Sequence, residues 1–240
     1  MENKFLGQKG LKCVVLCGGM GTRMFPLTQT KQKTMLQVKQ NPLLRYVIDY
    51  WSQFTKDFIF VASYKHEQVL SFVKDMPICH ESIVEADPRG IANAILLAKD
   101  SVSESFIVVL GDCICHGEFL FPKNLEQGVG VWRTSKQEDI KRSYSISLAQ
   151  SGVISDVIEK PEQLINDLCG MGFYFFNRKV FDYIKITEPS ARSGKVEITD
   201  VIRKMIKSGE KVLPVFFEGE YLNVTYSEDL QNAERILNKK

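Results

Sequence analysis

Apolar runs alternate with segments of helical periodicity over the first half of the chain. Runs without a polar break predict buried strands at residues 11–17, 57–63 and 105–112. Apolar side chains at helical spacing predict helices at residues 41–54, 66–76 and 90–101. Alternation of this kind predicts an α/β fold with a mostly parallel sheet and helices on both faces.

The pattern changes after about residue 115. Short β-rich segments follow at residues 128–134, 144–150, 152–161 and 169–176. Helices are predicted at 177–184, 197–209 and 227–237, with a strand at 211–219. We therefore expect a flexible N-terminal lead over 1–10 and a single domain over 11–240. Within this domain we expect a nucleotide-binding half (about 11–115) that continues into a β-rich half (about 116–240).

Charge and composition exclude several classes of protein. The formal net charge is only +2, and Lys and Arg are spread among acidic residues, so the chain lacks the basic stripe of a nucleic-acid binder. It has no apolar stretch long enough to span a membrane and no signal-peptide pattern, so we expect no membrane partner. Six cysteines without a secretion signal predict free thiols and a cytoplasmic protein. Cys113, Cys115 and His116 lack a second Cys/His pair at zinc-site spacing, which disfavours a zinc site.

Three glycines follow the first predicted strand and suggest a phosphate-binding loop. Gly18, Gly19 and Gly21 would lie at the carboxyl edge of the sheet, where ligands bind in open parallel sheets. Without Cβ atoms, their backbone N–H groups can approach phosphate closely. The spacing matches neither the dinucleotide fingerprint nor the Walker A loop, and a tight turn alone would also use glycines. Arg23 and Lys33 add two positive charges suited to phosphate oxygens.

The motif CGGMGTRMFPLT, followed by a lysine and by MLQV and NPLL, resembles the signature of sugar-1-phosphate nucleotidylyltransferases. Further segments match in the order of that family: DPRGIANAI, VVLGD, IEKP, GFYFF and PSARSGKVEITDVI. Together they span roughly residues 11 to 235. The resemblance implies a Rossmann-like, mostly parallel mixed sheet flanked by helices, the nucleotide-diphospho-sugar transferase fold, with a β-rich sugar-binding lobe. It also implies a reaction in which an NTP and a sugar-1-phosphate give an NDP-sugar and pyrophosphate.

The same resemblance implies roles on the nucleotide side. The residues expected to contact the nucleotide are Leu16, Gly18, Gly19, Gly21, Thr22, Arg23, Glu85 and Gly90. Arg23 would stabilise charge on the departing pyrophosphate, and Lys33 would hold the α-phosphate. In-line phosphoryl transfer needs mainly positioning and neutralisation of charge, which a loop of N–H donors and two cations can supply. No protein nucleophile is required, because the sugar phosphate attacks directly.

A magnesium ion is the cofactor that the resemblance implies. Asp112, at the end of a predicted strand, resembles the first metal ligand of the family. Asn223 stands where the family usually has a second Asp, and its carbonyl oxygen could serve in its place. Mg²⁺ often takes only one or two carboxylates together with phosphates and water. The loss of one negative charge predicts weaker metal affinity.

On the sugar side, the segment IEKP places Glu159 and Lys160. Lys160 would hold the phosphate of the sugar, and Glu159 would accept hydrogen bonds from sugar hydroxyls. Further contacts implied by the resemblance are Tyr144, Gly172 and Glu197, with Arg192 as a weaker candidate. Ser145 replaces a glycine that relatives usually have, so the identity of the sugar stays open.

Glu85 carries the prediction of the base. Relatives that use dTTP or UTP usually have Gln at this place, whereas a carboxylate only accepts hydrogen bonds. It could accept from N1–H and N2–H of guanine, as in the mannose- and heptose-1-phosphate guanylyltransferases, which the chain resembles here. Other segments are closer to glucose-1-phosphate thymidylyltransferases, and Glu85 could instead bind cytosine or face solvent. The sequence alone favours GTP, ahead of dTTP, UTP or CTP.

Two alternatives remain. A catalytically silent relative would explain the departures from the family at Asn223, Ser145 and residues 32–34. Retention of all four charged positions argues against it: Arg23, Lys33, Asp112 and Lys160. Transfer to a phosphorylated non-sugar acceptor is disfavoured by the segments at 158–161 and 197–200. The sequence leaves the oligomeric state open, with a homo-oligomer among the options.

Overall fold

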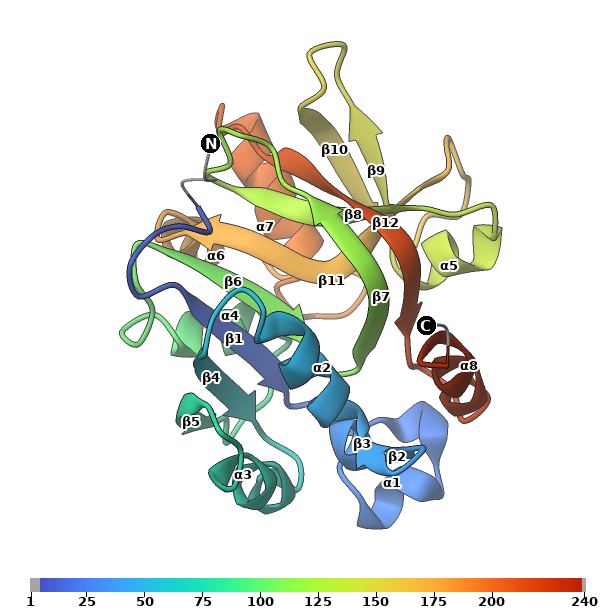
Figure 1. Ribbon diagram of the computed structural model, residues 1–240. Coiled ribbons are helices and arrows are strands. Elements are labelled where there is room, and N and C mark those ends of the chain that lie inside the picture. Colours follow the sequence, from blue (N-terminus) through green and yellow to red (C-terminus); the bar gives the residue numbers. More distant parts are fainter. Residues whose placement is uncertain (1–4, 239–240) are drawn as a thin grey trace.

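One mixed sheet runs through the whole molecule (Figure 1). The computed structural model describes residues 5–238, and among these ten strands join the sheet. Eight lie in the order β5-β4-β1-β6-β11-β8-β12-β7, while β9 and β10 form a ribbon attached to β11. Their bounds are β1 Lys12–Cys17, β4 Asp57–Ala62, β5 Cys79–Val84, β6 Ser105–Leu110, β7 Cys113–Leu120, β8 Gly128–Arg133, β9 Tyr144–Leu148, β10 Ile154–Glu159, β11 Leu168–Asn177 and β12 Leu213–Asn223.

The first half of the sheet is parallel, as the alternation of strands and helices predicts. β5, β4, β1 and β6 run in the same direction. Val14 and Leu16 of β1 pack on one face, whereas Cys13, Val15 and Cys17 pack on the other. This double burial explains why β1 is an unbroken apolar run.

Helices cover both faces of this sheet. One core includes side chains of α2 (Leu43–Trp51) and α3 (His66–Lys74). The opposite core includes side chains of α4 (Ile91–Leu97), α6 (Val180–Ile186) and α7 (Ile198–Lys207). The expected arrangement of a mixed sheet flanked by helices is therefore confirmed.

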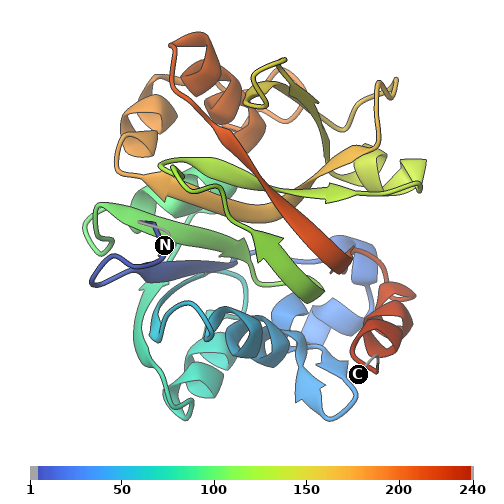
Figure 2. The ribbon, with the colours of Figure 1, turned by 45° about the horizontal axis from the view of Figure 1, so that its top comes forward.

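The second half of the sheet combines antiparallel pairs with one parallel pair, between β8 and β12. β11 pairs antiparallel with β6 and β8, and β12 pairs antiparallel with β7. Figure 2 shows β12 crossing the molecule towards α8 (Asp229–Ile236), which lies beside the small β2–β3 hairpin (Gln37–Val38 and Asn41–Pro42). The remaining short helices are η1 Thr22–Met24, α1 Leu27–Thr30, η2 Lys33–Met35 and α5 Gln137–Arg142.

The sequence prediction lacks the short elements between β1 and α2 and also β5, β7 and α5, and it ends β12 too early. β5 is an edge strand whose first residues are exposed, so it lacks an apolar signature. β7 and α5 were also not predicted. β12 continues past Gly219, where the prediction ends, to Asn223. This extension carries Asn223 to the end of β6.

The N-terminal segment is packed over its described part. Phe5 is buried against Phe175, and Gln8 donates to the backbone oxygen of Ser105. The expected flexible lead therefore does not fit residues 5–10, while residues 1–4 lie outside the described part. Within residues 5–238, the helices are too short or too polar to cross a bilayer.

Candidate active site at the carboxyl edge of the sheet

The glycine loop begins directly after β1. Gly21 has φ 63°, and its carbonyl oxygen accepts from Thr28 Oγ1 at 2.7 Å. A Cβ atom at Gly21 would lie 3.0 Å from Thr28 Cγ2 and 3.2 Å from Lys33 Cβ. Glycine is therefore required at Gly21 both by the left-handed conformation and by the close approach of the lysine.

Gln32 fixes the chain just before Lys33. Its fully buried side chain donates to the carbonyl oxygen of Cys17 at 2.5 Å and accepts from Thr34 Oγ1 at 2.6 Å. Gln32 thus joins the end of β1 to the turn that carries Lys33. Residues 32–34 depart from the family motif, and in this chain the hydrogen bonds of Gln32 hold the turn that carries Lys33.

Lys33 and Asp112 form an ion pair between the glycine loop and the end of β6. Their side chains are only 13% and 19% exposed, so the pair is largely screened from solvent. Gly111, before Asp112, donates to Leu16 at the end of β1. The two charges expected to act on phosphate and metal therefore lie together at one edge of the sheet.

Asn223 reaches the same place through β12. It pairs in register with Cys113, and the next residue, Val224, donates its N–H to the carbonyl oxygen of Asp112 at 3.1 Å. The structure thus brings the two predicted metal ligands, Asp112 and Asn223, onto adjacent strand ends.

The donor set at this edge fits a magnesium ion only with help from substrate. The described residues contain no group of three or more His, Cys, Asp or Glu arranged for a metal. Asp112 offers one carboxylate and Asn223 one amide oxygen, and phosphate oxygens of a nucleotide would complete the shell. Lys33 contacts Asp112 at this position, so a cation there competes with the lysine.

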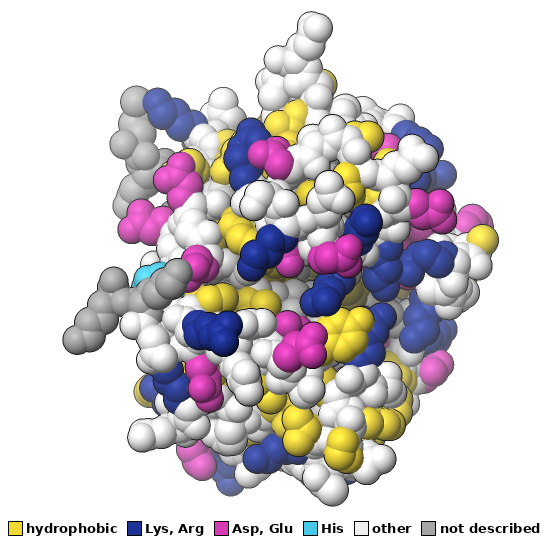
Figure 3. Space-filling view, turned by 90° about the vertical axis from the view of Figure 1, so that its right-hand side faces the viewer, with side chains coloured by type: hydrophobic (Ala, Val, Ile, Leu, Met, Phe, Trp, Pro, Cys, Tyr) yellow, Lys and Arg dark blue, Asp and Glu magenta, His cyan; other side chains and the backbone are white. Residues whose placement is uncertain are grey.

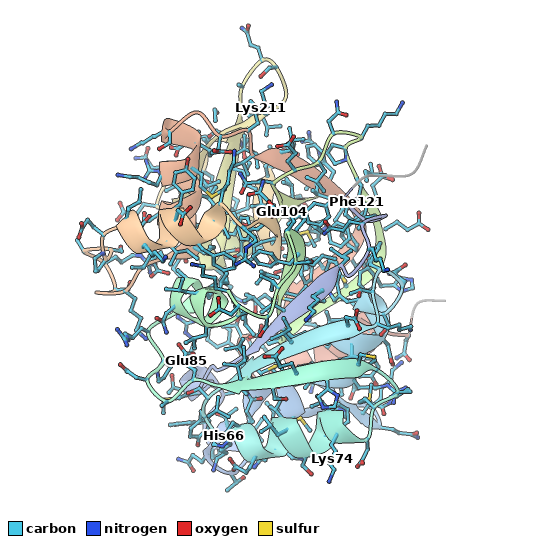
Figure 4. The ribbon with its side chains drawn as sticks, turned by 90° about the vertical axis from the view of Figure 1, so that its left-hand side faces the viewer. His66, Lys74, Glu85, Glu104, Phe121 and Lys211 are labelled. Carbon is cyan, nitrogen blue, oxygen red and sulfur yellow. The ribbon has the colours of Figure 1, made fainter. Side chains whose placement is uncertain are left out.

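Glu85 lies at the end of β5, two strands away from β1. Figure 4 shows it on the same side of the molecule as His66 at the start of α3, opposite Lys74 at the end of that helix. The side chain is buried, and its Oε1 accepts from Asn93 Nδ2 at 2.7 Å. Its Oε2 faces the glycine loop, 3.4 Å from where a Cβ atom of Gly18 would lie. The expectation that Glu85 faces the nucleotide side, and not solvent, fits this burial.

Arg23 is exposed on the outer side of the glycine loop. Within residues 5–238 it has no ion pair, in contrast to Lys33. Thr22 and the apolar side chains of Met20 and Phe25 are exposed beside it. Arg23 is therefore free to turn towards an anionic ligand.

On the sugar side, Glu159 ends β10 and shares an arginine with Glu197. Arg192 lies 2.8 Å from Glu197 and 3.6 Å from Glu159, while Thr199 Oγ1 donates to Glu159 at 3.4 Å. Burial and, to a smaller extent, the charge of Glu197 raise the pKa of Glu159 to about 7, although Lys160 and Arg192 partly oppose both. Arg192, the weaker candidate of the sequence, links the two carboxylates.

Lys160 has φ 45° and donates its N–H to the carbonyl oxygen of Ser143. This left-handed conformation in a residue other than glycine is uncommon and fits a functional position. The loop after α6 also reaches the nucleotide side, because Lys195 packs against Gly90 and donates to the carbonyl oxygen of Pro88 at 3.5 Å. One loop therefore touches both halves of the site.

Three predicted contact residues lie inside the fold. Tyr144 is buried, and its hydroxyl donates to Met171 O at 3.0 Å. The N–H of Gly172 donates to the hydroxyl of Tyr221, and Leu16 is buried in β1. Ser145 is also buried. These residues lie inside the protein. Direct contact with a substrate stays a prediction for each of them.

The thiols at the start of β7 pack among aromatic side chains. Cys113 Sγ lies 3.2 Å from the Tyr221 hydroxyl, and burial raises the pKa of both Cys113 and Cys115. His116 is exposed and belongs to the opposite face of the strand. The strand alternation therefore separates His116 from the two thiols.

A cavity of about 850 Å³ adjoins Asn223 between α5 and α8. Its lining mixes charges, including Arg142, Arg235, Glu138 and Asp229. Figure 3 shows this face, where Lys and Arg side chains are interspersed with Asp and Glu. The cavity is therefore lined by Asn223, one of the two predicted metal ligands.

Asn93 is a residue of the site to which the sequence analysis gave no role. Asn93 holds Glu85 from the first turn of α4, but eight residues separate the two along the chain. Their contact depends on the conformation of the loop between β5 and α4, which residue types alone do not reveal.

Comparisons with known proteins agree with this geometry. A family model described as nucleotidyl transferase matches residues 12–239. A UTP–glucose-1-phosphate uridylyltransferase of Haloferax volcanii is 29% identical over 240 residues, covering 96% of this chain and 98% of the relative. A bifunctional protein GlmU of Methanocaldococcus jannaschii is 28% identical over 230 residues, and the match covers 95% of this chain but 54% of that relative.

Solved structures show the same fold. A protein from Bacillus anthracis, assigned as a glucose-1-phosphate thymidylyltransferase and crystallised with a sucrose, matches with a TM-score of 0.81 and 26% identity over 96% of both chains. A UDP-glucose pyrophosphorylase bound to UDP-glucose matches with a TM-score of 0.80 and 21% identity, which supports the fold alone. The match to the family model covers nearly the whole chain and confirms the expected family: the protein belongs to the nucleotidyl transferases.

Proposed function

We propose that this protein is a sugar-1-phosphate nucleotidylyltransferase, which joins an NTP and a sugar-1-phosphate to give an NDP-sugar and pyrophosphate. The observation that carries the proposal is the Lys33–Asp112 ion pair at the base of the glycine loop. In this pair, Lys33 is a cation that can bind the α-phosphate, and Asp112 is an anion that can bind a metal ion. Both lie beside the glycine loop, whose backbone N–H groups can bind phosphate. The names of the relatives, which act on glucose-1-phosphate, support the acceptor class.

In the proposed reaction, an oxygen of the sugar phosphate attacks the α-phosphorus of the NTP. The new P–O bond forms as the bond to the β-phosphate oxygen breaks, and pyrophosphate leaves with that electron pair. Arg23 neutralises the leaving group, Lys33 the α-phosphate and Lys160 the attacking phosphate. Preorganised charges of this kind supply most of what in-line transfer requires.

A bound Mg²⁺ would be held by Asp112 and Asn223, and it would supply further neutralisation of phosphate charge. Glu159 and Glu197, linked by Arg192, would accept hydrogen bonds from hydroxyls of the sugar. The six cysteines are unpaired, which supports the cytoplasmic location expected from the sequence.

The common NTPs, each combined with a panel of sugar-1-phosphates and with a phosphorylated non-sugar acceptor in the presence of Mg²⁺, test the proposal by pyrophosphate release. We expect release that requires both substrates. Absence of release with every pair would instead favour the silent relative, and release with a phosphorylated non-sugar alone would favour the other acceptor class. The oligomeric state is measured in parallel by light scattering.

A further inference from the structure

The buried carboxylate of Glu85 is only partly available to a ligand. Its Oε1 accepts from Asn93 Nδ2 at 2.7 Å and lies 3.4 Å from the backbone N of Arg89. Its Oε2 faces Gly18, the first residue of the glycine loop. A nucleotide whose phosphates lie on that loop would therefore meet one acceptor oxygen of Glu85.

This arrangement bears on which base fits. Guanine presents two neighbouring donors, N1–H and N2–H, and a carboxylate binds both best with two free oxygens. Asn93 occupies one of these oxygens. Uracil and thymine present one N–H, at N3, beside the carbonyl oxygen O4. They require one acceptor and one neighbouring donor.

The side-chain amide of Asn93 has a second N–H group besides the one that binds Glu85. A carboxamide nitrogen carries two N–H groups, and the contact with Glu85 Oε1 uses one of them. The nitrogen must be the atom that faces Glu85, because the amide oxygen and the carboxylate are both acceptors. Asn93 is half-buried at the start of α4, so its position is set by the helix.

We propose that Asn93 determines base specificity: together with Glu85 Oε2 it presents a donor beside an acceptor, which suits UTP or dTTP over GTP. The inference rests on the proposed function and deepens it by naming the class of nucleotide. It departs from the GTP preference that the sequence alone favours, because Asn93 removes the second carboxylate oxygen that guanine would need.

The experiment compares kcat/KM for UTP, dTTP and GTP in the wild type and in Asn93→Ala and Asn93→Leu, with glucose-1-phosphate as acceptor. Leu has the same branching of heavy atoms as Asn, with two methyl groups in place of the amide, and so fills the position while removing the donor. Asn124→Ala, on an exposed loop, is the control. We expect the ratio of UTP (or dTTP) to GTP to fall about tenfold or more in both Asn93 variants, with the change mainly in KM.

A wild-type preference for GTP, or an unchanged ratio in Asn93→Leu, overturns the inference. A change in Asn93→Ala alone also overturns it, because it would reflect packing. If no pair of substrates releases pyrophosphate, the proposed function has failed. The inference is then decided by calorimetric binding of UTP and GTP to the same variants: a shift of the affinity ratio supports it, and an unchanged ratio or the absence of UTP binding refutes it.

Discussion

Lys33 and Asp112 are held in contact although 79 residues separate them along the chain. Gln32 anchors the first to β1, and the backbone of Gly111 anchors the second to the same strand. The ion pair is therefore built into the framework of the sheet, and not formed by two mobile surface side chains.

Removal of either partner should slow the reaction strongly without unfolding the protein. We expect Lys33→Ala and Asp112→Ala to lower kcat about a hundredfold to a thousandfold, because each removes a fixed charge from the reacting phosphates. Circular dichroism and thermal melting provide the check on folding. Full activity in either folded variant would contradict the role given to that residue.

Substitution of Arg23 should affect catalysis with little effect on stability. Its side chain is exposed and has no ion pair within residues 5–238, so Arg23→Ala should change the free energy of unfolding by less than about 0.5 kcal/mol. We expect kcat to fall about a hundredfold or more, since the charge on the leaving pyrophosphate is no longer neutralised. Arg23→Lys keeps the positive charge but loses the planar guanidinium group, so its kcat should lie between the values of the wild type and Arg23→Ala. An Arg23→Ala enzyme as fast as the wild type would refute the assignment.

Glu159 should make stability depend on pH. Its pKa is about 7 in the folded protein, above the ordinary value of 4.5. Below pH 4.5 the carboxyl is protonated in both states. Between pH 4.5 and 7 the unfolded chain releases the proton and the folded protein keeps it, so the free energy of unfolding falls as the pH rises.

Denaturant titrations of wild type and Glu159→Gln at pH 5 and pH 8 measure this effect. Between pH 5 and pH 8, the free energy of unfolding should fall on the order of 2–3 kcal/mol more in the wild type than in the variant. The exposed Glu162→Gln serves as the control and should behave as the wild type does. Parallel pH dependences of wild type and Glu159→Gln would show that the pKa of Glu159 is not raised.

Gly117 and Gly219 lie opposite each other in the β7–β12 ribbon, with φ 145° and 146°. A Cβ atom would lie 2.1 Å from Glu218 O at Gly117, and 2.3 Å from His116 O at Gly219. Either Gly→Ala variant should therefore lose about 3 kcal/mol or more of unfolding free energy.

Gly152→Ala is the matched control for that pair. Gly152 also has positive φ, at 81°, but within residues 5–238, apart from its own atoms and its two chain neighbours, no heavy atom lies within 4 Å of its would-be Cβ atom. It should lose only about 1–2 kcal/mol, the cost of the left-handed conformation. Equal losses in all three variants, measured by denaturant titration, would mean that the close contact in the ribbon contributes nothing.

The sequence predicted well where burial leaves a strong pattern. β1 and β6 are buried on both faces, so their apolar runs were unmistakable, and the ends of these strands located Gly18 and Asp112 correctly at one edge. β5 was missed because Cys79, His80 and Glu81 are exposed on the edge of the sheet.

The parts of the site that the sequence did not predict depend on contacts between distant segments. The bond from Asn93 to Glu85 and the double ion pair of Arg192 follow from loop conformations that leave no periodic pattern. Gln32 was read as a departure from the family motif, yet it supports Lys33 through two buried hydrogen bonds. Residue identity alone could not reveal these pairings.

The proposed reaction transfers the nucleotidyl group of an NTP to the phosphate of a sugar-1-phosphate. Incubation of glucose-1-phosphate with Mg²⁺ and UTP radiolabelled on its α-phosphate tests it most directly. We expect the label to appear in UDP-glucose, in an amount equal to the unlabelled pyrophosphate released. Label that stays in UTP, or that appears in UMP without any sugar nucleotide, would contradict the account.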